Sequence, residues 1–344
     1  MSTTTNPSIL SRREFLKLSS LGLTGLFIPP VRDSWDLMPD LQGRVIDNEI
    51  AVFDEPSFQG RELKKYWKDM VLPISRATVG AAEPAYNRIW YCIGDQGYAH
   101  SGNIQPVKTI LNQPSESIPA TGVLTEVSVP FTDAFWGPGN YYPFAYRLYY
   151  ETTHWVDGSI SSDQGQVWYR IQDDKWEVHY YVPGKHMRLI SANEVSPLSP
   201  EVPSQGKRIT VDNIKQLVVA YEWETPVFMA RAATGAQFSN GRYLTPTGTH
   251  QTFHKRPYRH MAAGNLAYNG YDLPGVPWIS YITEKGVAFH GTYWHNDYGQ
   301  PRSHGCINLT PQAAKWIYRW TQPEVPFGEQ FAYEKFGTRV DVIG

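Results

Sequence analysis

The sequence predicts a mostly β protein built from two or three domains. Its 344 residues exceed the size of a single typical domain, which is roughly 100–200 residues. Its 12 tryptophans and 22 tyrosines favour strands over helices. Its 28 glycines and 26 prolines are frequent enough to separate many short strands. Each domain would be large enough to bury a core without disulfide bonds.

The charge balance of the chain does not point to a strongly charged partner. The chain has 31 basic and 33 acidic residues, for a formal net charge of −2, and 41% of its residues are hydrophobic. These values are ordinary for a soluble globular protein. They give no reason to expect nucleic acid or an anionic membrane as a partner, and no obligate protein partner is evident.

The first thirty residues have the features of an export signal. Ser11–Lys17 contains paired arginines followed by Phe-Leu-Lys, and the weakly apolar stretch Leu18–Ile28 precedes two prolines. This pattern resembles a twin-arginine signal, which implies a location in the cell envelope. The stretch is shorter than the ~20 apolar residues that span a bilayer. Cleavage and retention as an anchor both stay open, as does a basic amphipathic first helix of a cytoplasmic protein.

Short strands begin after a polar linker at residues 31–42. Within residues 43–112, the apolar segment Ile50–Phe53 ends at a turn signal, and Ile89–Ile93 ends at Gly94-Asp95. The segment Ile104–Val107 closes this region. We expect a small β-barrel here, and its Trp-Tyr-x-Ile strand resembles those of bacterial SH3-like domains.

Residues 113–200 contain a segment that resembles a strand of this barrel. The segment Val167–Ile171 repeats the Trp-Tyr-x-Ile pattern, and Trp90 and Trp168 lie 168 − 90 = 78 residues apart. A fixed offset of this kind indicates a repeated structural unit. We therefore predict a second β-rich domain, SH3-like or not. The alternative is a coincidence between two aromatic strands.

The last region, residues 207–344, follows a boundary rich in proline and serine at residues 195–205. Strands are expected first, in Arg208–Val211, Gln216–Tyr221 and Pro226–Ala233. One helix is expected late. Thr310 suits the N-cap, Pro311 suits the first helical position, and the apolar side chains downstream fall on one face: Ala313, Trp316, Ile317 and Trp320.

The two cysteines differ in their surroundings. Cys92 lies in an apolar run and reads as a small buried hydrophobe, although a bridge to Cys306 is an alternative. Cys306 follows Gly305 and lies within sixteen residues of His290, His295 and His304. Because the thiolate is the attacking species, a nearby imidazole that takes the proton and forms an ion pair with the sulfur would activate it. The glycine would let the amides of Gly305 and Cys306 converge on an oxyanion.

The whole stretch resembles the signature of the L,D-transpeptidase catalytic domain, also called YkuD-like. The signature is a histidine, a spacer of about a dozen residues, then Ser/Thr-His-Gly-Cys, an apolar residue and Asn or Arg. Here it is His290 followed by Ser303–Asn308. Thr245–Gly248 resembles the family's Thr-Pro-x-Gly turn. The resemblance implies a C-terminal β-sandwich of L,D-transpeptidase type with one or two short helices, over about residues 207–344.

The resemblance also implies roles for individual residues. Cys306 would attack a carbonyl of a peptidoglycan stem peptide and form a thioester, which an amine of a second stem resolves. His290 would be the general base, and the carbonyl of Gly291 would orient its ring. Ser303, His304 and Gly305 would support the oxyanion hole. Tyr293 would bind substrate, and Asn308 would either bind substrate or support the loop. Carbapenem-type β-lactams would react with the same sulfur. No cofactor and no metal are implied.

Several alternatives remain open at this point. The histidines near Cys306 could ligate zinc, but their spacing fits no common zinc pattern. With water as acceptor, the same thioester would make the protein an L,D-carboxypeptidase. A wall-binding protein without catalysis is a third alternative. Met261–Tyr271 is either a mobile cover over a peptide site or an ordinary surface loop. The other histidines are expected to be structural or on the surface: His100, His154, His179, His186, His250, His254 and His260.

Overall fold

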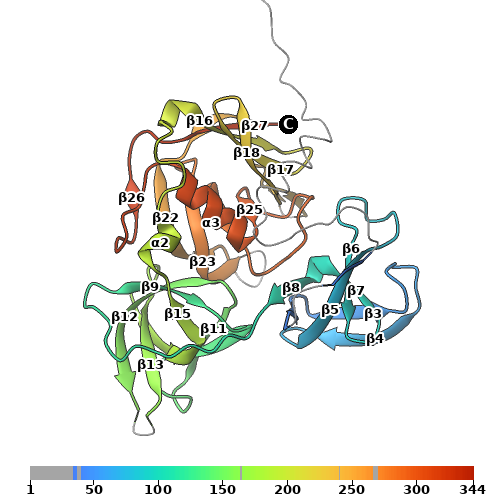
Figure 1. The fold of residues 1–344 in the computed structure, drawn as a ribbon, viewed down its shortest axis with the longest axis horizontal. Helices are drawn as coiled ribbons and strands as arrows, with labels where there is room; N and C mark the ends of the chain where they lie inside the picture. The colour runs from blue at the N-terminus through green and yellow to red at the C-terminus, as the bar shows by residue number, and fades with distance from the viewer. Residues whose placement is uncertain (1–33, 37–39, 163–164, 240, 266–269) are drawn as a thin grey trace, which may run out of the picture.

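The computed structural model describes residues 34–36, 40–162, 165–239, 241–265 and 270–344. The predicted export signal and most of the linker that follows it lie outside these residues. The described chain is mostly β, as predicted, and its strands fall into three successive units (Figure 1). Within the described residues, no helix is both long enough and apolar enough to cross a membrane.

The first unit is one strongly bent sheet with the strand order β4-β3-β7-β6-β5-β2-β8, and β1 pairs with β5. Alternating residues of its strands bury a separate apolar core that includes Val52, Ile74 and Ile93. The bounds of its strands are Ser34–Asp36 (β1), Gln42–Val45 (β2), Glu49–Phe53 (β3), Glu62–Trp67 (β4), Val71–Val79 (β5), Ile89–Ile93 (β6), Tyr98–His100 (β7) and Ile104–Val107 (β8).

The second unit repeats the first. Its strand order is β11-β10-β14-β13-β12-β9-β15, which is the order of the first unit with each strand replaced by its counterpart. In both units a 3₁₀ turn precedes the last strand, at Ser101–Asn103 and at Gly184–His186. The predicted repeat is therefore present in the topology, and the SH3-like character of either unit stays a prediction. The strands are Val123–Val127 (β9), Phe131–Phe135 (β10), Phe144–Tyr149 (β11), Thr153–Ser161 (β12), Val167–Gln172 (β13), His179–Pro183 (β14) and Met187–Leu189 (β15).

The third unit follows the short helix α2 (Ala192–Val195) and a 3₁₀ turn at Ser204–Gly206. It has two five-stranded sheets, ordered β18-β17-β16-β27-β21 and β25-β24-β23-β22-β26, and a small hairpin of β19 and β20. Its strands are Lys207–Asp212 (β16), Leu217–Glu222 (β17), Thr225–Arg231 (β18), Gln237–Phe238 (β19), Gly241–Arg242 (β20), Gly248–Gln251 (β21), His254–Ala263 (β22), Tyr271–Tyr281 (β23), Ala288–Gly291 (β24), Ile307–Leu309 (β25), Ala332–Tyr333 (β26) and Arg339–Ile343 (β27).

The predicted helix is α3, Pro311–Trp320. Thr310 caps it, because its hydroxyl accepts a hydrogen bond from the amide of Ala313 at 3.2 Å. Its buried side chains, Ala314, Ile317 and Trp320 among them, join the core between the two sheets. Ala313 and Trp316, which the sequence placed on the same face, are only partly buried at the edge of that core.

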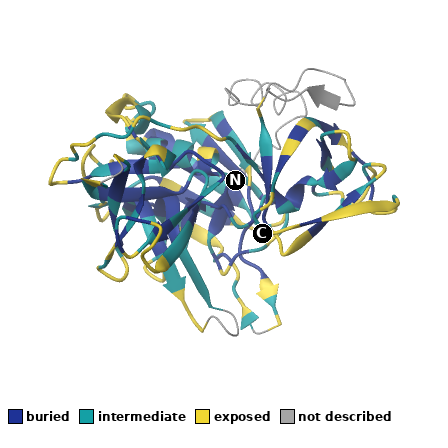
Figure 2. Ribbon diagram, turned by 90° about the horizontal axis from the view of Figure 1, so that it is seen from below, coloured by how far each residue is buried: buried dark blue, intermediate teal, exposed yellow. Residues whose placement is uncertain are grey.

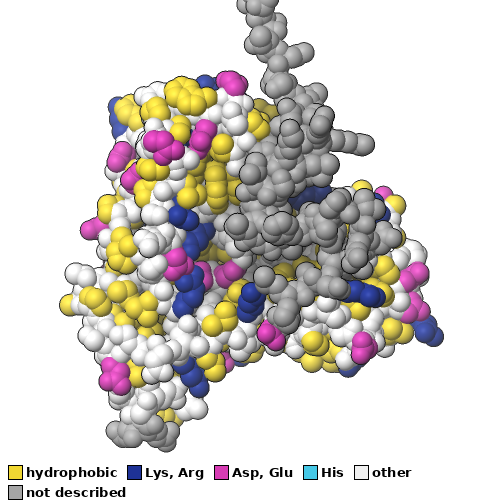
Figure 3. Space-filling view, viewed as in Figure 1, with side chains coloured by type: hydrophobic (Ala, Val, Ile, Leu, Met, Phe, Trp, Pro, Cys, Tyr) yellow, Lys and Arg dark blue, Asp and Glu magenta, His cyan; other side chains and the backbone are white. Residues whose placement is uncertain are grey.

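The third unit shares its core with the second. Leu124, Trp155 and Ile190 of the second unit belong to the same buried cluster as the strands around α3. Trp155 stacks on Tyr258 with ring centroids 6.1 Å apart. Buried residues line the inside of the strands, and exposed ones gather at hairpin ends (Figure 2). On the face in Figure 3, acidic and basic side chains are interspersed over the described surface.

Candidate active site

The backbone brings His290 and Cys306 to neighbouring strands. His290 is near the end of β24, and Cys306 immediately precedes β25. The two strands pair in parallel, with Phe289 opposite Ile307 and His290 opposite Asn308. Extended by one residue, this register sets Cys306 opposite Ala288. Side chains alternate between the faces of a sheet, so Cys306 and His290 project from the same face as diagonal neighbours.

Cys306 lies against an apolar floor and remains partly exposed. The floor consists of three residues with no exposed surface, Val276, Ile279 and Ala288, and Trp294 and Tyr281 pack beside them. The sulfur lies 3.5 Å from the carbonyl oxygen of Gly286. Cys92 is buried and its thiol is also free, so the bridge between the two cysteines considered above is not formed.

The predicted partner of His290 is in place. Nδ1 of His290 lies 3.0 Å from the carbonyl oxygen of Gly291, so a proton on Nδ1 would leave Nε2 as the free base. The Trp294 ring lies 5.7 Å from the imidazole. Because His290 is buried, with 3% of its surface exposed, its ring has little freedom to turn away from this orientation.

Burial determines the charge state of the pair. It lowers the pKa of His290 to about 4, although the Gly291 carbonyl opposes the shift. It raises the pKa of the Cys306 thiol to about 11, against a smaller opposing effect of the Ala288 amide. Both groups are therefore neutral at pH 7, which differs from the ion pair expected from the sequence. A neutral imidazole would have to remove the thiol proton during attack, as a general base does.

This charge state predicts the pH dependence of thiol alkylation. In a Cys92→Ala background, iodoacetamide should modify Cys306 at pH 7 roughly two orders of magnitude more slowly than a free cysteine of pKa ~8.5. The rate should then rise about tenfold per pH unit towards pH 11, because only the thiolate reacts. Mass spectrometry over time measures it. A rate that is flat between pH 6 and pH 8 would instead indicate an ion pair.

The loop before Cys306 is held by its own hydrogen bonds. Ser303 Oγ donates to the Cys306 carbonyl oxygen at 2.5 Å and accepts from the Gly305 amide at 3.0 Å. The hydroxyl of Thr245 donates to the Gly305 carbonyl oxygen at 2.7 Å. Gly305 has φ +115°, a value that side chains with a Cβ rarely adopt. The support roles predicted for Ser303 and Gly305 thus have matching contacts, and so does the resemblance of Thr245–Gly248 to the family's turn.

One part of the oxyanion prediction does not fit this conformation. The Gly305 amide already donates to Ser303, so it cannot also donate to a substrate oxyanion unless that bond is exchanged. His304 is exposed and its ring stacks on Phe238, with centroids 4.7 Å apart, and also contacts Tyr243 and Tyr271. Its side chain is therefore part of an aromatic rim beside Cys306.

The two residues predicted to bind substrate are buried. Tyr293 has 4% of its surface exposed, stacks on Tyr149 at 5.1 Å and donates to the Pro274 carbonyl. Asn308 is 1% exposed, and its amide lies 3.0 Å from Nε2 of His295. The Tyr293 ring faces the second unit in this structure, and its predicted contact with substrate stays a prediction. Asn308 has the loop-supporting contact that the sequence offered as its other role.

Sequence reasoning missed the contacts that hold the segment between His290 and Ser303. Arg44 of the first unit donates to the Tyr293 carbonyl oxygen at 2.5 Å and to Asp69 at 2.9 Å, and its guanidinium lies 4.1 Å above the Tyr149 ring. Asn296 donates to two carbonyl oxygens of the first unit. Asp297 accepts from Asn87 of that unit and from Arg302. No local pattern in the sequence could have identified these partners.

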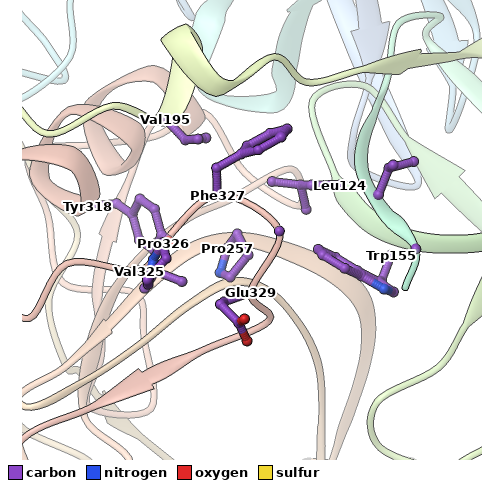
Figure 4. Close-up of a pocket in the computed structure, with 12 residues that line it drawn as sticks. Leu124, Trp155, Val195, Pro257, Tyr318, Val325, Pro326, Phe327 and Glu329 are labelled. Atoms are coloured by element: carbon purple, nitrogen blue, oxygen red, sulfur yellow. The ribbon is translucent and has the colours of Figure 1, made fainter. Parts of the chain in front are cut away.

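Two hollows lie away from the thiol. An apolar cavity of about 40 Å³ separates Leu124 and Trp155 of the second unit from Tyr318, Val325 and Phe327 (Figure 4). A more polar pocket of about 590 Å³ is lined partly by Ile282, Thr283 and Glu284 of the turn after β23, and Gly286 of the same turn contacts Cys306. Among the described residues, no three His, Cys, Asp or Glu side chains are grouped so that they could hold a metal ion.

Comparison with known proteins assigns the third unit to a family. Residues 206–342 match the profile of the YkuD family, the L,D-transpeptidase catalytic domain. The chain carries an L,D-transpeptidase catalytic domain. The match begins at the 3₁₀ turn before β16 and ends within β27, so this catalytic domain contains the two sheets, α3, His290 and Cys306.

The relatives extend the similarity beyond the catalytic domain. The chain is 25% identical over 258 residues to L,D-transpeptidase 2 of Mycobacterium tuberculosis (strain CDC 1551 / Oshkosh), which covers 72% of this chain. The chain spans about half the length of that relative, 52%. Among solved structures, an L,D-transpeptidase from Mycobacterium smegmatis is 17% identical over 69% of this chain and all of its own, with a TM-score of 0.33. L,D-transpeptidase 3 of Mycobacterium tuberculosis with a faropenem-derived adduct is 18% identical over 49% of this chain and 74% of its own, with a TM-score of 0.32.

Proposed function

We propose that this protein is an exported L,D-transpeptidase that remodels peptidoglycan stem peptides through a thioester on Cys306. The observation that carries the proposal is the parallel pairing of β24 and β25. It sets the thiol and a neutral, oriented imidazole on one face of one sheet, beside an apolar floor. The catalytic domain match supports the same assignment. Export is supported only by the twin-arginine pattern of the sequence.

The proposed reaction follows from this arrangement. As the sulfur of Cys306 attacks the scissile carbonyl carbon, Nε2 of His290 accepts the thiol proton. The tetrahedral intermediate collapses, the C–N bond breaks, and His290 returns the proton to the leaving amine of the terminal D-residue. The amine of a second stem then attacks the thioester and passes a proton to His290. The new amide bond forms, and the thiol is restored with that proton.

A carbapenem tests the nucleophile. Its strained β-lactam carbonyl should acylate Cys306 and add the mass of one inhibitor molecule to the protein, and peptide mapping should locate the adduct. Cys92→Ala should leave the adduct intact, since that thiol is buried. Cys306→Ala should form none. An adduct that persists in Cys306→Ala would refute the proposed nucleophile.

Tetrapeptide donors test the acceptor. Transpeptidation yields cross-linked dimers when an acceptor stem is present, whereas an L,D-carboxypeptidase yields tripeptides alone. Chromatography with mass detection separates the two products. Tripeptides alone at saturating acceptor would establish the hydrolase that the sequence left open.

A further inference from the structure

A row of aromatic rings crosses the boundary between the second unit and the catalytic domain. The rings are, in order, Trp136, Tyr180, Tyr146, His260 and Trp176, and we call them the aromatic row. The distances between neighbouring ring centroids are 6.5, 5.3, 5.3 and 6.2 Å. Spacings of this kind are those of contacting edge-to-face or tilted rings. The mechanism proposed above uses none of the five.

The row has exposed ends and a fixed middle. Trp136 is 45% exposed and Trp176 is 52% exposed, whereas Tyr180 and His260 are 1% and 2% exposed. Nδ1 and Nε2 of His260 lie 2.6 Å from an Asp173 oxygen and 2.5 Å from an Asp272 oxygen. Two exposed indoles therefore rest on a buried support that is anchored by charged hydrogen bonds, so little side-chain freedom remains to be lost on binding.

The strand register sets the rings of the second unit on one face. Ala134 pairs with Tyr146, and Phe135 pairs with Tyr181. The register shifts after Ala134, and the ring contacts themselves place Trp136 beside Tyr180 and Tyr180 beside Tyr146.

The turn between β10 and β11 adds two exposed rings near the Trp136 end of the aromatic row. It carries Tyr141, 79% exposed, and Tyr142, 38% exposed, whose rings lie 4.6 Å apart. A Cβ on Gly137 or Gly139 would overlap these rings, so the two rings pack directly against the backbone of these glycines. The Trp136 amide donates to the Pro143 carbonyl oxygen at 3.0 Å, which holds Trp136 close to this turn. Exposed aromatic side chains gathered in this way are typical of a binding surface.

Strand β23 connects the row with the active site. Asp272, which holds His260, follows Tyr271, and the ring of Tyr271 lies 6.0 Å from that of His304. His304 is two residues before Cys306. Tyr271 and Asp272 are consecutive residues of β23 and project from opposite faces of it, so the row and the aromatic rim of Cys306 are joined through this strand.

We propose that the aromatic row binds the polysaccharide strand of peptidoglycan, with pyranose rings stacked on Trp136 and Trp176. This inference rests on the proposed function, because it assigns the sugar part of the same substrate. A pyranose has an apolar face of C–H groups and a polar edge, and Trp and Tyr rings offer an apolar face with a polar group at the rim. A strongly charged partner fits less well. Charges of both signs lie beside the row: the Lys175 ammonium is 5.6 Å from the Trp176 ring centroid, and a carboxylate oxygen of Asp272 holds His260.

Binding of soluble oligomers of β-1,4-linked N-acetylglucosamine, which carry no stem peptide, tests the proposal. The full chain with Cys306→Ala is titrated by calorimetry, so the outcome does not depend on thioester chemistry. The parent should bind in a saturable manner. Trp136→Ala and Trp176→Ala should each weaken binding about tenfold, by loss of one stacked ring. Trp176→Phe should recover part of the loss.

Trp67→Ala is the matched control, since Trp67 is 58% exposed on β4 of the first unit. It should bind like the parent. Melting curves of all variants check that they are folded. If Trp136→Ala is unfolded, Tyr141→Ala tests the same end of the aromatic row. Equal binding by Trp176→Ala and Trp67→Ala would overturn the proposal, as would a parent that binds stem peptides but no oligosaccharide. Adduct formation on Cys306 in the wild type is measured separately, so either proposal can fail alone.

Discussion

Replacing His290 with glutamine should slow the acylation of Cys306 by about 10²–10⁴-fold, the usual contribution of a general base. The effect should be this large because the thiol is neutral at pH 7, with a pKa raised to about 11. Without a base, attack depends on the small fraction of thiolate. The measurement is the single-turnover rate of β-lactam ring opening, followed by absorbance and by protein mass.

The control for this variant is His179→Gln. His179 is 42% exposed in the second unit, where it pairs with Asp157, and it has no contact with the site. Its loss should leave the acylation rate unchanged. Melting temperatures of both variants check that the buried position 290 tolerates the amide. If Cys306 is acylated equally fast in the two variants, His290 is not the general base. The neutral states assigned to Cys306 and His290 would then not explain the reaction.

Replacing Arg44 with alanine should lower the free energy of unfolding by about 3–5 kcal/mol, the usual cost of breaking a buried ion pair. Arg44 has 1% of its surface exposed and donates to Asp69, Gln105 and the carbonyl oxygen of Tyr293. Burial lowers the pKa of its guanidinium, which still stays charged at any working pH. Truncation would leave the Tyr293 carbonyl oxygen and one oxygen of Asp69 without their donor, while the other Asp69 oxygen keeps Arg147 at 3.0 Å.

Arg61→Ala is the matched control for Arg44→Ala. The Arg61 side chain is 78% exposed, and its nearest carboxylate, on Asp54, lies 3.5 Å away. Exposed pairs of this kind contribute about 0–1 kcal/mol. Arg44→Lys should fall between the two, because an ammonium keeps the charge but cannot donate in the planar arrangement of a guanidinium. Urea unfolding of all three variants measures the differences, and equal midpoints for Arg44→Ala and Arg61→Ala would contradict the prediction.

Features set by neighbouring residues could be predicted from the sequence. Thr310 and Pro311 fixed the start of α3, since an N-cap hydroxyl and a proline act within one turn. The strands β17 and β18 were predicted from the local runs Gln216–Tyr221 and Pro226–Ala233. The positions of His290 and Cys306 came from a motif with several fixed identities. The repeat of the first unit was visible only in one strand, because strand order is conserved in space while most of its side chains differ.

Features set by distant residues could not be predicted. Arg44 and Tyr293 are 249 residues apart, and no periodicity relates them. The burial of individual side chains could not be predicted from the sequence either, and two differences from the expectations result from it. It made the Cys306–His290 pair neutral, and it placed Tyr293 against Tyr149 when a substrate contact had been expected. The Gly305 amide illustrates a third limit, since its partner Ser303 is only two residues away but depends on the loop's actual conformation.

The common core of the second unit and the catalytic domain has a practical meaning for how this chain can be divided. A cut in the proline- and serine-rich boundary at residues 195–205 passes between two sequence domains, yet it would strip Leu124, Trp155 and Ile190 from the cluster around α3. Water would then reach side chains such as Tyr258 that are packed dry in the intact protein. A fragment that begins at this boundary would therefore carry the nucleophile together with an apolar surface that the second unit covers in the intact chain.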